Sequence, residues 1–171
     1  MTLRYYAGVL IHIQELFMSR PSSDTIFQLH YSYYIEIFTY ILLRRITRLL
    51  WLVQIIASCA VMTNALPAWI SGSLMIICTY FLCAYRTHGD SIRAVIQANR
   101  YSDLISRSNE LTDDEIKVQL RLLEYDDSSV MNVFLNPAYY RACIRNGVTP
   151  ETRPLTRTEK LFAALAGGIP Q

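Results

Sequence analysis

Basic clusters and lysine are nearly absent from this chain of 171 residues. Lys117 and Lys160 are the only lysines among its 16 basic residues, and no run of five or six Lys or Arg occurs. The formal net charge is +2, which is too small and too dispersed for a general nucleic-acid footprint. We therefore expect no nucleic-acid partner.

Recognisable catalytic and cofactor motifs are also lacking. The histidines His12, His30 and His88 are scattered, and none has a second His or a Cys at a spacing typical of metal ligands. No G-x-S-x-G elbow, P-loop or dinucleotide fingerprint occurs. The sequence thus predicts a protein that is not an enzyme, with no catalytic residue, no cofactor and no metal.

Cysteine is too sparse for a disulfide-rich secreted domain, because the chain has only four cysteines and three of them lie in an apolar stretch. A cleavable signal peptide is not predicted either. The apolar segment Val9–Phe17 contains His12 and Glu15, and it leads to no clear small-residue cleavage site.

The most informative absence is that of charge, because residues 49–85 form 37 consecutive uncharged positions. About 20 apolar residues cross a bilayer as a helix, and about 17 suffice where flanking side chains reach the headgroups. Asn64 favours a turn near the middle of this stretch, and Pro67 suits the start of a second helix. We predict a transmembrane hairpin over residues 46–85, with spans at 46–62 and 68–85. The alternative is a hairpin buried in a soluble bundle, whose helices would normally keep a polar stripe.

Arginines flank the predicted hairpin on both outer sides. Arg44, Arg45 and Arg48 precede it, Arg86 and Arg93 follow it, and its turn carries no charge. The positive-inside rule then places both termini in the cytoplasm.

Polar and small residues within the spans indicate how the helices meet. Gln54 is the only large polar side chain deep in the first span, and it would hydrogen-bond across the hairpin or between copies in a homo-oligomer. Small residues would let the helices approach closely: Ala57, Ser58, Ala60, Ser71, Gly72 and Ser73.

The aromatic segment 26–43 leaves two arrangements open within an N-terminal region, residues 1–45. It either lies in the membrane interface as an amphipathic helix that continues into the first span, or forms a third span that carries Glu36. We favour the interface, because tyrosines are dense and an ionised Glu at mid-membrane is costly. In a third span, Glu36 would be a functional residue with a partner.

Residues 86–147 predict a cytoplasmic helical region. A helix capped by Asp90 would run over 91–107 and bury one apolar face made of Ile92, Val95, Ile96, Leu104 and Ile105. Arg93, Arg100 and Arg107 recur every seven residues along another face. This arginine stripe is either a contact for anionic headgroups or an acidic partner, or simply a solvated face, which we favour.

Further capping signals divide the rest of the chain. Thr112 to Glu115 match a capping box that begins a helix ending near Tyr125. Asn136-Pro137 predicts a helix start with Asn as cap, and Gly147 predicts its end. Residues 148–171 then form a linker and a short helix over 159–166, which begins at Thr156 or Thr158.

Two runs in the C-terminal half carry a family resemblance. Residues 136–142 read NPAYYRA, and residues 152–161 read TRPLTRTEKL. With the apolar centre and small size, they resemble the inner-membrane entry-exclusion proteins of IncI-type conjugative plasmids. The resemblance implies a bacterial inner-membrane protein that blocks redundant conjugative transfer by recognising a component of the donor's conjugation apparatus. A cytoplasmic C-terminal half conflicts with meeting such a partner, so access would need the turn at 63–68 or an inverted topology.

Two other functions fit the same outline of an all-α membrane protein. The first is an oligomerising two-span effector or holin-like protein that permeabilises the membrane, with Gln54, Ser58, Ser71 and Ser73 lining a pore. The second is a structural subunit of a larger membrane complex, which would be unstable when expressed alone.

Overall fold

The computed structural model describes residues 21–63, 65–84, 87–127, 131–151 and 153–168, so the segment Val9–Phe17 lies outside the described residues. All regular structure in these residues is helical, which confirms the predicted all-α fold. The elements are α2 (Ser23–Met62), α3 (Ala68–Ala84), α4 (Thr87–Arg107), α5 (Asp113–Tyr125), the 3₁₀ helix η1 (Asn132–Phe134), α6 (Leu135–Asn146) and α7 (Arg157–Leu165).

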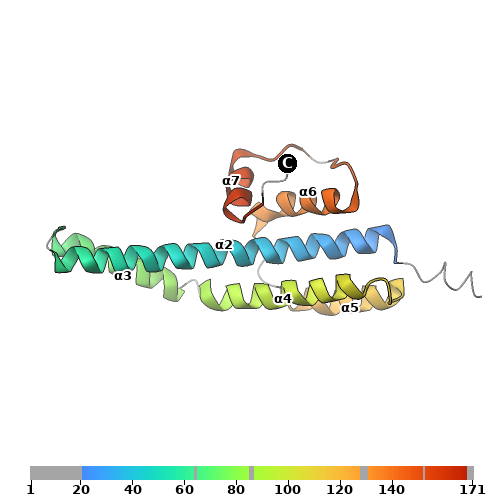
Figure 1. Cartoon of the computed structure of the whole chain (residues 1–171), viewed down its shortest axis with the longest axis horizontal. Helices are drawn as coiled ribbons and strands as arrows, with labels where there is room; N and C mark the ends of the chain where they lie inside the picture. The colour runs from blue at the N-terminus through green and yellow to red at the C-terminus, as the bar shows by residue number, and fades with distance from the viewer. Residues whose placement is uncertain (1–20, 64, 85–86, 128–130, 152, 169–171) are drawn as a thin grey trace, which may run out of the picture.

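Helix α2 organises the whole molecule (Figure 1). It contains 40 residues, which corresponds to a length of about 60 Å. The Ser22 hydroxyl caps its start by accepting a hydrogen bond from the Asp24 backbone N–H. In Figure 1, α4 and α5 lie on one side of its N-terminal half, α6 and α7 lie on the opposite side, and α3 follows its C-terminal half. The predicted boundary between residues 45 and 46 therefore falls inside one continuous helix.

Residues 26–43 continue into residues 46–62 as one helix, as the first predicted arrangement expects. They are largely covered by other helices of the chain, however, which neither arrangement predicted. One face of α2 packs through Leu29 against Tyr101 and Leu104, in a cluster that also contains Leu120. A second cluster joins Ile35, Phe38 and Leu42 to Phe134, Ala138 and Ala166. Apolar side chains on two faces of α2 thus meet protein, because α4 to α7 return to this half of the helix.

Helix α4 approaches α2 through small residues rather than through its branched apolar side chains. Ala94 and Ala98 are fully buried, together with Tyr101, whereas Ile92 and Ile96 are exposed. Of the predicted apolar face, Leu104 is buried, and Val95 and Ile105 are half-buried. Alanine lets two helix backbones come close, so small side chains lie at this interface in place of the more apolar isoleucines. The prediction that Asp90 caps this helix is also wrong, because α4 begins at Thr87 and Asp90 lies in its first turn.

Most of the later helix ends lie where the capping signals predict them. Thr112 and Glu115 form the expected capping box of α5. Gly147 ends α6 with a φ of 68°, the left-handed conformation that glycine adopts without strain. Thr156 caps α7, which begins two residues earlier than predicted. Asn136 is not a cap, because the preceding 3₁₀ turn starts α6 at Leu135.

His30 gives the bundle a predicted pH dependence. Burial lowers the pKa of His30 below 6.5. The hydrogen bond between its ring and Asn146, at 3.3 Å, acts in the opposite direction but has the smaller effect. A lowered pKa means that the unfolded state binds the proton more tightly, so the free energy of unfolding should fall as the pH drops through 6.5. Thermal unfolding between pH 8 and about 5.5 measures this slope. His30→Gln should flatten the curve over that range, and an unchanged slope would assign the effect to another group.

Candidate functional site

The most unusual surface of the molecule is the apolar hairpin of α2 and α3. Large apolar side chains point outward from both helices. For example, the side chains of Ile55, Trp69 and Ile76 are 60%, 74% and 72% exposed. The set on the two helices is Leu49, Trp51, Leu52, Ile55, Ile56, Val61, Met62, Trp69, Ile70, Leu74, Ile76, Ile77, Tyr80 and Phe81. A water-exposed protein surface rarely holds a contiguous apolar patch of this extent, which is typical of a membrane or protein contact.

Among the described residues, α2 is the helix long and apolar enough to cross a membrane. Only 6% of its most apolar 18-residue stretch is buried, so that stretch differs from the core helix of a soluble protein. α3 is apolar as well but has 17 residues, which is short for a membrane span.

Polar groups inside the hairpin hold its two helices together. The Gln54 side-chain amide donates a hydrogen bond to the Thr79 hydroxyl at 3.0 Å, which links α2 to α3. Of the two predicted arrangements for Gln54, this is the bond across the hairpin. The Ser58 hydroxyl lies 3.7 Å from the Met75 sulfur. Ala57 and Ser71 are buried at the same interface, as expected for small residues between closely packed helices.

The Gln54–Thr79 bond should be measurable as a coupling energy. In apolar surroundings, such interhelical bonds contribute about 0.6 kcal/mol on average. A double-mutant cycle with Gln54→Leu and Thr79→Val, read by reversible unfolding in mixed micelles, should give a coupling near that value. Fully additive single effects would show that the two side chains do not meet.

The predicted arginine stripe is divided by the fold. Arg100 forms an ion pair with Asp126 at 3.1 Å, and Arg107 pairs with Asp103 at 3.8 Å on the same helix. Arg93 is exposed at the other end of α4, toward the hairpin. The three side chains therefore do not converge on one partner.

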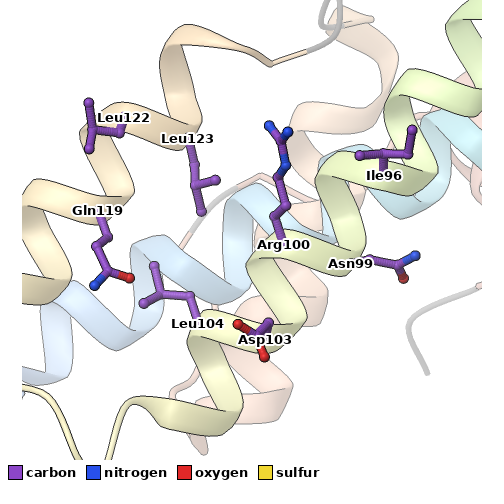
Figure 2. Close-up of a pocket in the computed structure, with 8 residues that line it drawn as sticks. All are labelled: Ile96, Asn99, Arg100, Asp103, Leu104, Gln119, Leu122 and Leu123. Carbon is purple, nitrogen blue, oxygen red and sulfur yellow. The ribbon is translucent and has the colours of Figure 1, made fainter.

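A groove of about 550 Å³ lies between α4 and α5, as Figure 2 shows. Its lining is Ile96, Asn99, Arg100, Asp103, Leu104, Gln119, Leu122 and Leu123. Leu122 is 68% exposed at the rim, and Val118 and Tyr125 lie exposed on the same helix. This groove is a second exposed apolar surface, separate from the hairpin.

Polar side chains of α4 bind Asp127, which lies just after α5. The Tyr101 hydroxyl donates to the Asp127 carboxylate at 2.8 Å, and the Gln97 amide donates to the same oxygen at 3.1 Å. Burial raises the pKa of Asp127, against the effect of these two hydrogen bonds. Burial also raises the pKa of Tyr101, and the Asp127 carboxylate adds to this rise. The pair thus fastens the segment after α5 to α4.

Glu36 is 1% exposed and lies within the protein interior of the bundle. It is shielded from solvent, and it is the one charged side chain among the buried residues of α2. The structure therefore gives Glu36 a place in the packing of the bundle, away from the apolar hairpin.

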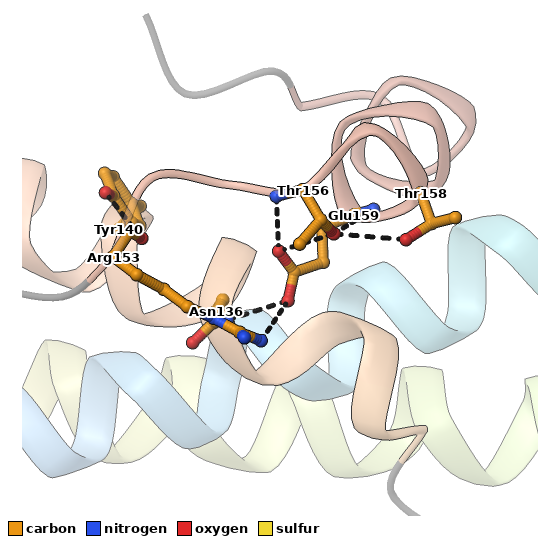
Figure 3. A network of polar contacts seen from close by, with 6 residues as sticks. All are labelled: Asn136, Tyr140, Arg153, Thr156, Thr158 and Glu159. Atoms are coloured by element: carbon orange, nitrogen blue, oxygen red, sulfur yellow. Dashed lines mark hydrogen bonds and ion pairs between the residues drawn. The ribbon is translucent and has the colours of Figure 1, made fainter.

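A second glutamate, Glu159, forms a polar network that the sequence did not single out (Figure 3). The Asn136 side-chain amide donates to one carboxylate oxygen at 2.7 Å, and Arg153 lies 3.6 Å from the same oxygen. The other oxygen accepts from the Thr156 backbone N–H at 2.7 Å and from its hydroxyl at 2.9 Å. Burial would raise the pKa of Glu159, but these hydrogen bonds lower it below its usual value. The signal that could have found this network is the T-x-x-E spacing of a second capping box.

No protein-family model, curated protein or solved structure matches this chain. Within the described part of the chain, no group of three or more His, Cys, Asp and Glu residues could hold a metal ion.

Proposed function

We propose that this protein is anchored in a membrane by the α2–α3 hairpin and acts there by binding another protein. The observation that carries the proposal is the exposed apolar surface of the hairpin, which stops where Arg44, Arg45 and Arg48 begin. Lipid would cover that surface, and arginines at its edge would lie among the headgroups.

In this proposal, the hairpin spans the membrane twice and both termini lie in the cytoplasm. α3, with 17 residues, would cross if the flanking polar residues reach the headgroups and the bilayer thins slightly. The positive-inside rule supports this orientation, because the arginines lie outside the hairpin and none lies in its turn.

The groove between α4 and α5 supports the binding role. Leu122 lines the groove and is exposed, and Val118 and Tyr125 are exposed on the same helix. Exposed apolar clusters on a soluble surface are typical of protein contacts. The protein would then act without catalysis, by occupying a partner at the membrane.

We propose plasmid entry exclusion as the specific role, in the inner membrane of a bacterium that already holds a conjugative plasmid. The support is the resemblance of residues 136–142 and 152–161 to that family. In the fold, these two runs belong to one unit, because Asn136 and Arg153 both contact Glu159.

A mating assay with this gene alone in the recipient tests the role. Expression should lower conjugative uptake of a related plasmid without slowing growth, whereas uptake of an unrelated plasmid should not change. With both termini in the cytoplasm, the turn is the part that faces a donor's apparatus, so an insertion after Ala65 should restore uptake. Leu122→Asp should restore uptake only if the topology is inverted and the groove faces outward. Unchanged uptake of the related plasmid would reject entry exclusion.

The alternative is an effector that oligomerises and permeabilises the membrane. Its expected pore residues are distributed unfavourably, because Ser71 is buried between the helices and Gln54 bonds to Thr79 inside the hairpin. Depolarisation or death of cells on expression, in place of a fall in uptake, would favour this alternative.

A further inference from the structure

A groove of about 440 Å³ lies between α2 and α4, at the level where the exposed apolar hairpin meets the soluble bundle. Its lining combines positive charge, aromatic rings, hydroxyl groups and aliphatic side chains: Tyr40, Arg44, Thr47, Arg48, Trp51, Ser91, Ile92 and Val95. This combination of chemistry differs from that of the α4–α5 groove, which pairs its arginine with an acidic residue.

The wall formed by α2 is one continuous stripe of the helix. Its members recur every three or four residues, which places them on one face over about three turns. Arg44 is held in position, because its guanidinium donates a hydrogen bond to the Tyr40 hydroxyl at 2.5 Å and lies 5.6 Å from the centre of that ring.

The positive charge of this groove is available to a ligand. Among the residues that the structure describes, no carboxylate lies within 4.0 Å of the Arg44 or Arg48 guanidinium groups. Arg45 differs, because it donates to the carbonyl oxygens of Ala164 and Leu165, at 3.3 and 2.7 Å, at the end of α7. Of the three neighbouring arginines, one is thus engaged by the bundle and two line the groove.

We propose that this groove binds an anionic phospholipid, with Arg44 and Arg48 at the headgroup phosphate. Guanidinium groups suit phosphate oxygens, since they donate charge-assisted hydrogen bonds in a planar fork. Trp51 would lie at the boundary of headgroups and acyl chains, where its ring is favourably placed. The inference rests on the proposed membrane anchorage.

The apolar side of the groove favours a lipid over free phosphate. Ile92 is 44% exposed and Val95 lies beside it, facing the same groove as the arginines. The first acyl carbons of a phospholipid would cover these side chains, whereas inorganic phosphate would leave them in water. This accounts for an exposed isoleucine on a helix that buries the smaller side chains of Ala94 and Ala98.

Tryptophan quenching tests the proposal on the full chain in vesicles. The chain has two tryptophans, so Trp69→Phe leaves Trp51 as the single reporter beside the groove. Phosphatidylglycerol or phosphatidylcholine, brominated close to the carbonyl, is included at equal fraction in otherwise identical vesicles. We expect Trp51 to be quenched preferentially by the anionic lipid, with a preference of about 25-fold, since each of the two surface arginines contributes roughly fivefold.

Charge-matched variants separate a site from general attraction. Arg44→Gln with Arg48→Gln should abolish the preference, whereas Arg107→Gln with Arg121→Gln should keep it, because both of these arginines are exposed on distant parts of α4 and α5. Equal losses in the two double variants would overturn the proposal, as would an absence of preference in the parent. Suppression of the preference by inorganic phosphate at constant ionic strength would identify a free-phosphate site instead and also overturn it.

Failure of the anchorage itself gives a different result. Trp51→Phe leaves Trp69, at the far end of the hairpin, as the reporter. Trp69 without quenching by either lipid would reject the membrane hairpin. Quenched Trp69 with no lipid preference at Trp51 would reject the phospholipid site alone.

Discussion

Aspartate at both Ile55 and Ile76 should remove the protein from the membrane fraction. These side chains are 60% and 72% exposed near the middles of the two proposed spans. A charged residue at the centre of a membrane helix costs about 3 kcal/mol, so the pair would cost about 6 kcal/mol of insertion free energy. Alkaline carbonate extraction, followed by sedimentation and immunoblotting, measures the bound fraction.

The same substitution at water-exposed sites provides the matched control. Val118 and Leu122 are 58% and 68% exposed on α5, outside the hairpin. Val118→Asp with Leu122→Asp should leave the membrane fraction unchanged. If water rather than lipid surrounded the hairpin, the parent chain would already be extracted by carbonate, and neither double variant would change its membrane fraction.

Glu159→Ala should release α7 from the bundle, with a loss of about 2 to 4 kcal/mol in the free energy of unfolding. Hydrogen bonds to a charged group contribute about 1.5 to 3 kcal/mol, and a lost cap adds about 1 kcal/mol. The half-buried amide of Asn136 would also lose its acceptor at 2.7 Å. The expected readouts are a lower Tm in detergent and faster proteolysis in the linker, residues 148–156.

The chain contains its own control, because Glu115 forms a capping box of the same type on α5. Glu115 is exposed and bonds only within the Thr112 box among the interactions found for it, so Glu115→Ala should cost about 1 kcal/mol or less. A cycle of Glu159→Ala with Asn136→Ala should show strong coupling. Equal costs for the two glutamates would contradict the structural role given to Glu159.

The helix ends and the apolar centre were predictable, because they depend on neighbouring residues. A capping box such as Thr112 to Glu115 satisfies backbone groups within one turn, and Gly147 stops a helix by its own φ. The Gln54 contact across the hairpin was one of two predicted arrangements, since a tight turn at residues 63–67 limits what Gln54 can meet.

The environment of residues 26–43 was not predictable, because it depends on segments that follow 60 to 130 positions later. Tyr101 and Phe134 bury the aromatic half of α2, so its apolar faces meet protein instead of a membrane interface. The same reason explains the error on α4. Ala94 and Ala98 look less apolar than Ile92, yet a close helix contact buries the smaller side chains.

The full set of contacts around Glu159 was also not predictable from the sequence pattern. Spacing alone identifies Thr156 and Glu159 as a cap, but it does not show that Asn136 and Arg153 converge on the same carboxylate. The Arg44 and Arg48 groove needs α4 as its second wall, so flanking charge in the sequence indicated only orientation.

Cysteine accessibility at the hairpin turn tests most directly whether lipid surrounds the hairpin. In a chain with its four cysteines replaced, Ala65→Cys places a thiol at the exposed turn, and Ser102→Cys places one on the exposed side of α4. A membrane-impermeant maleimide should label the Ala65→Cys chain in intact spheroplasts, and the Ser102→Cys chain only after lysis. If both thiols stay unlabelled until lysis and the chain then remains in the soluble fraction, the membrane hairpin is contradicted.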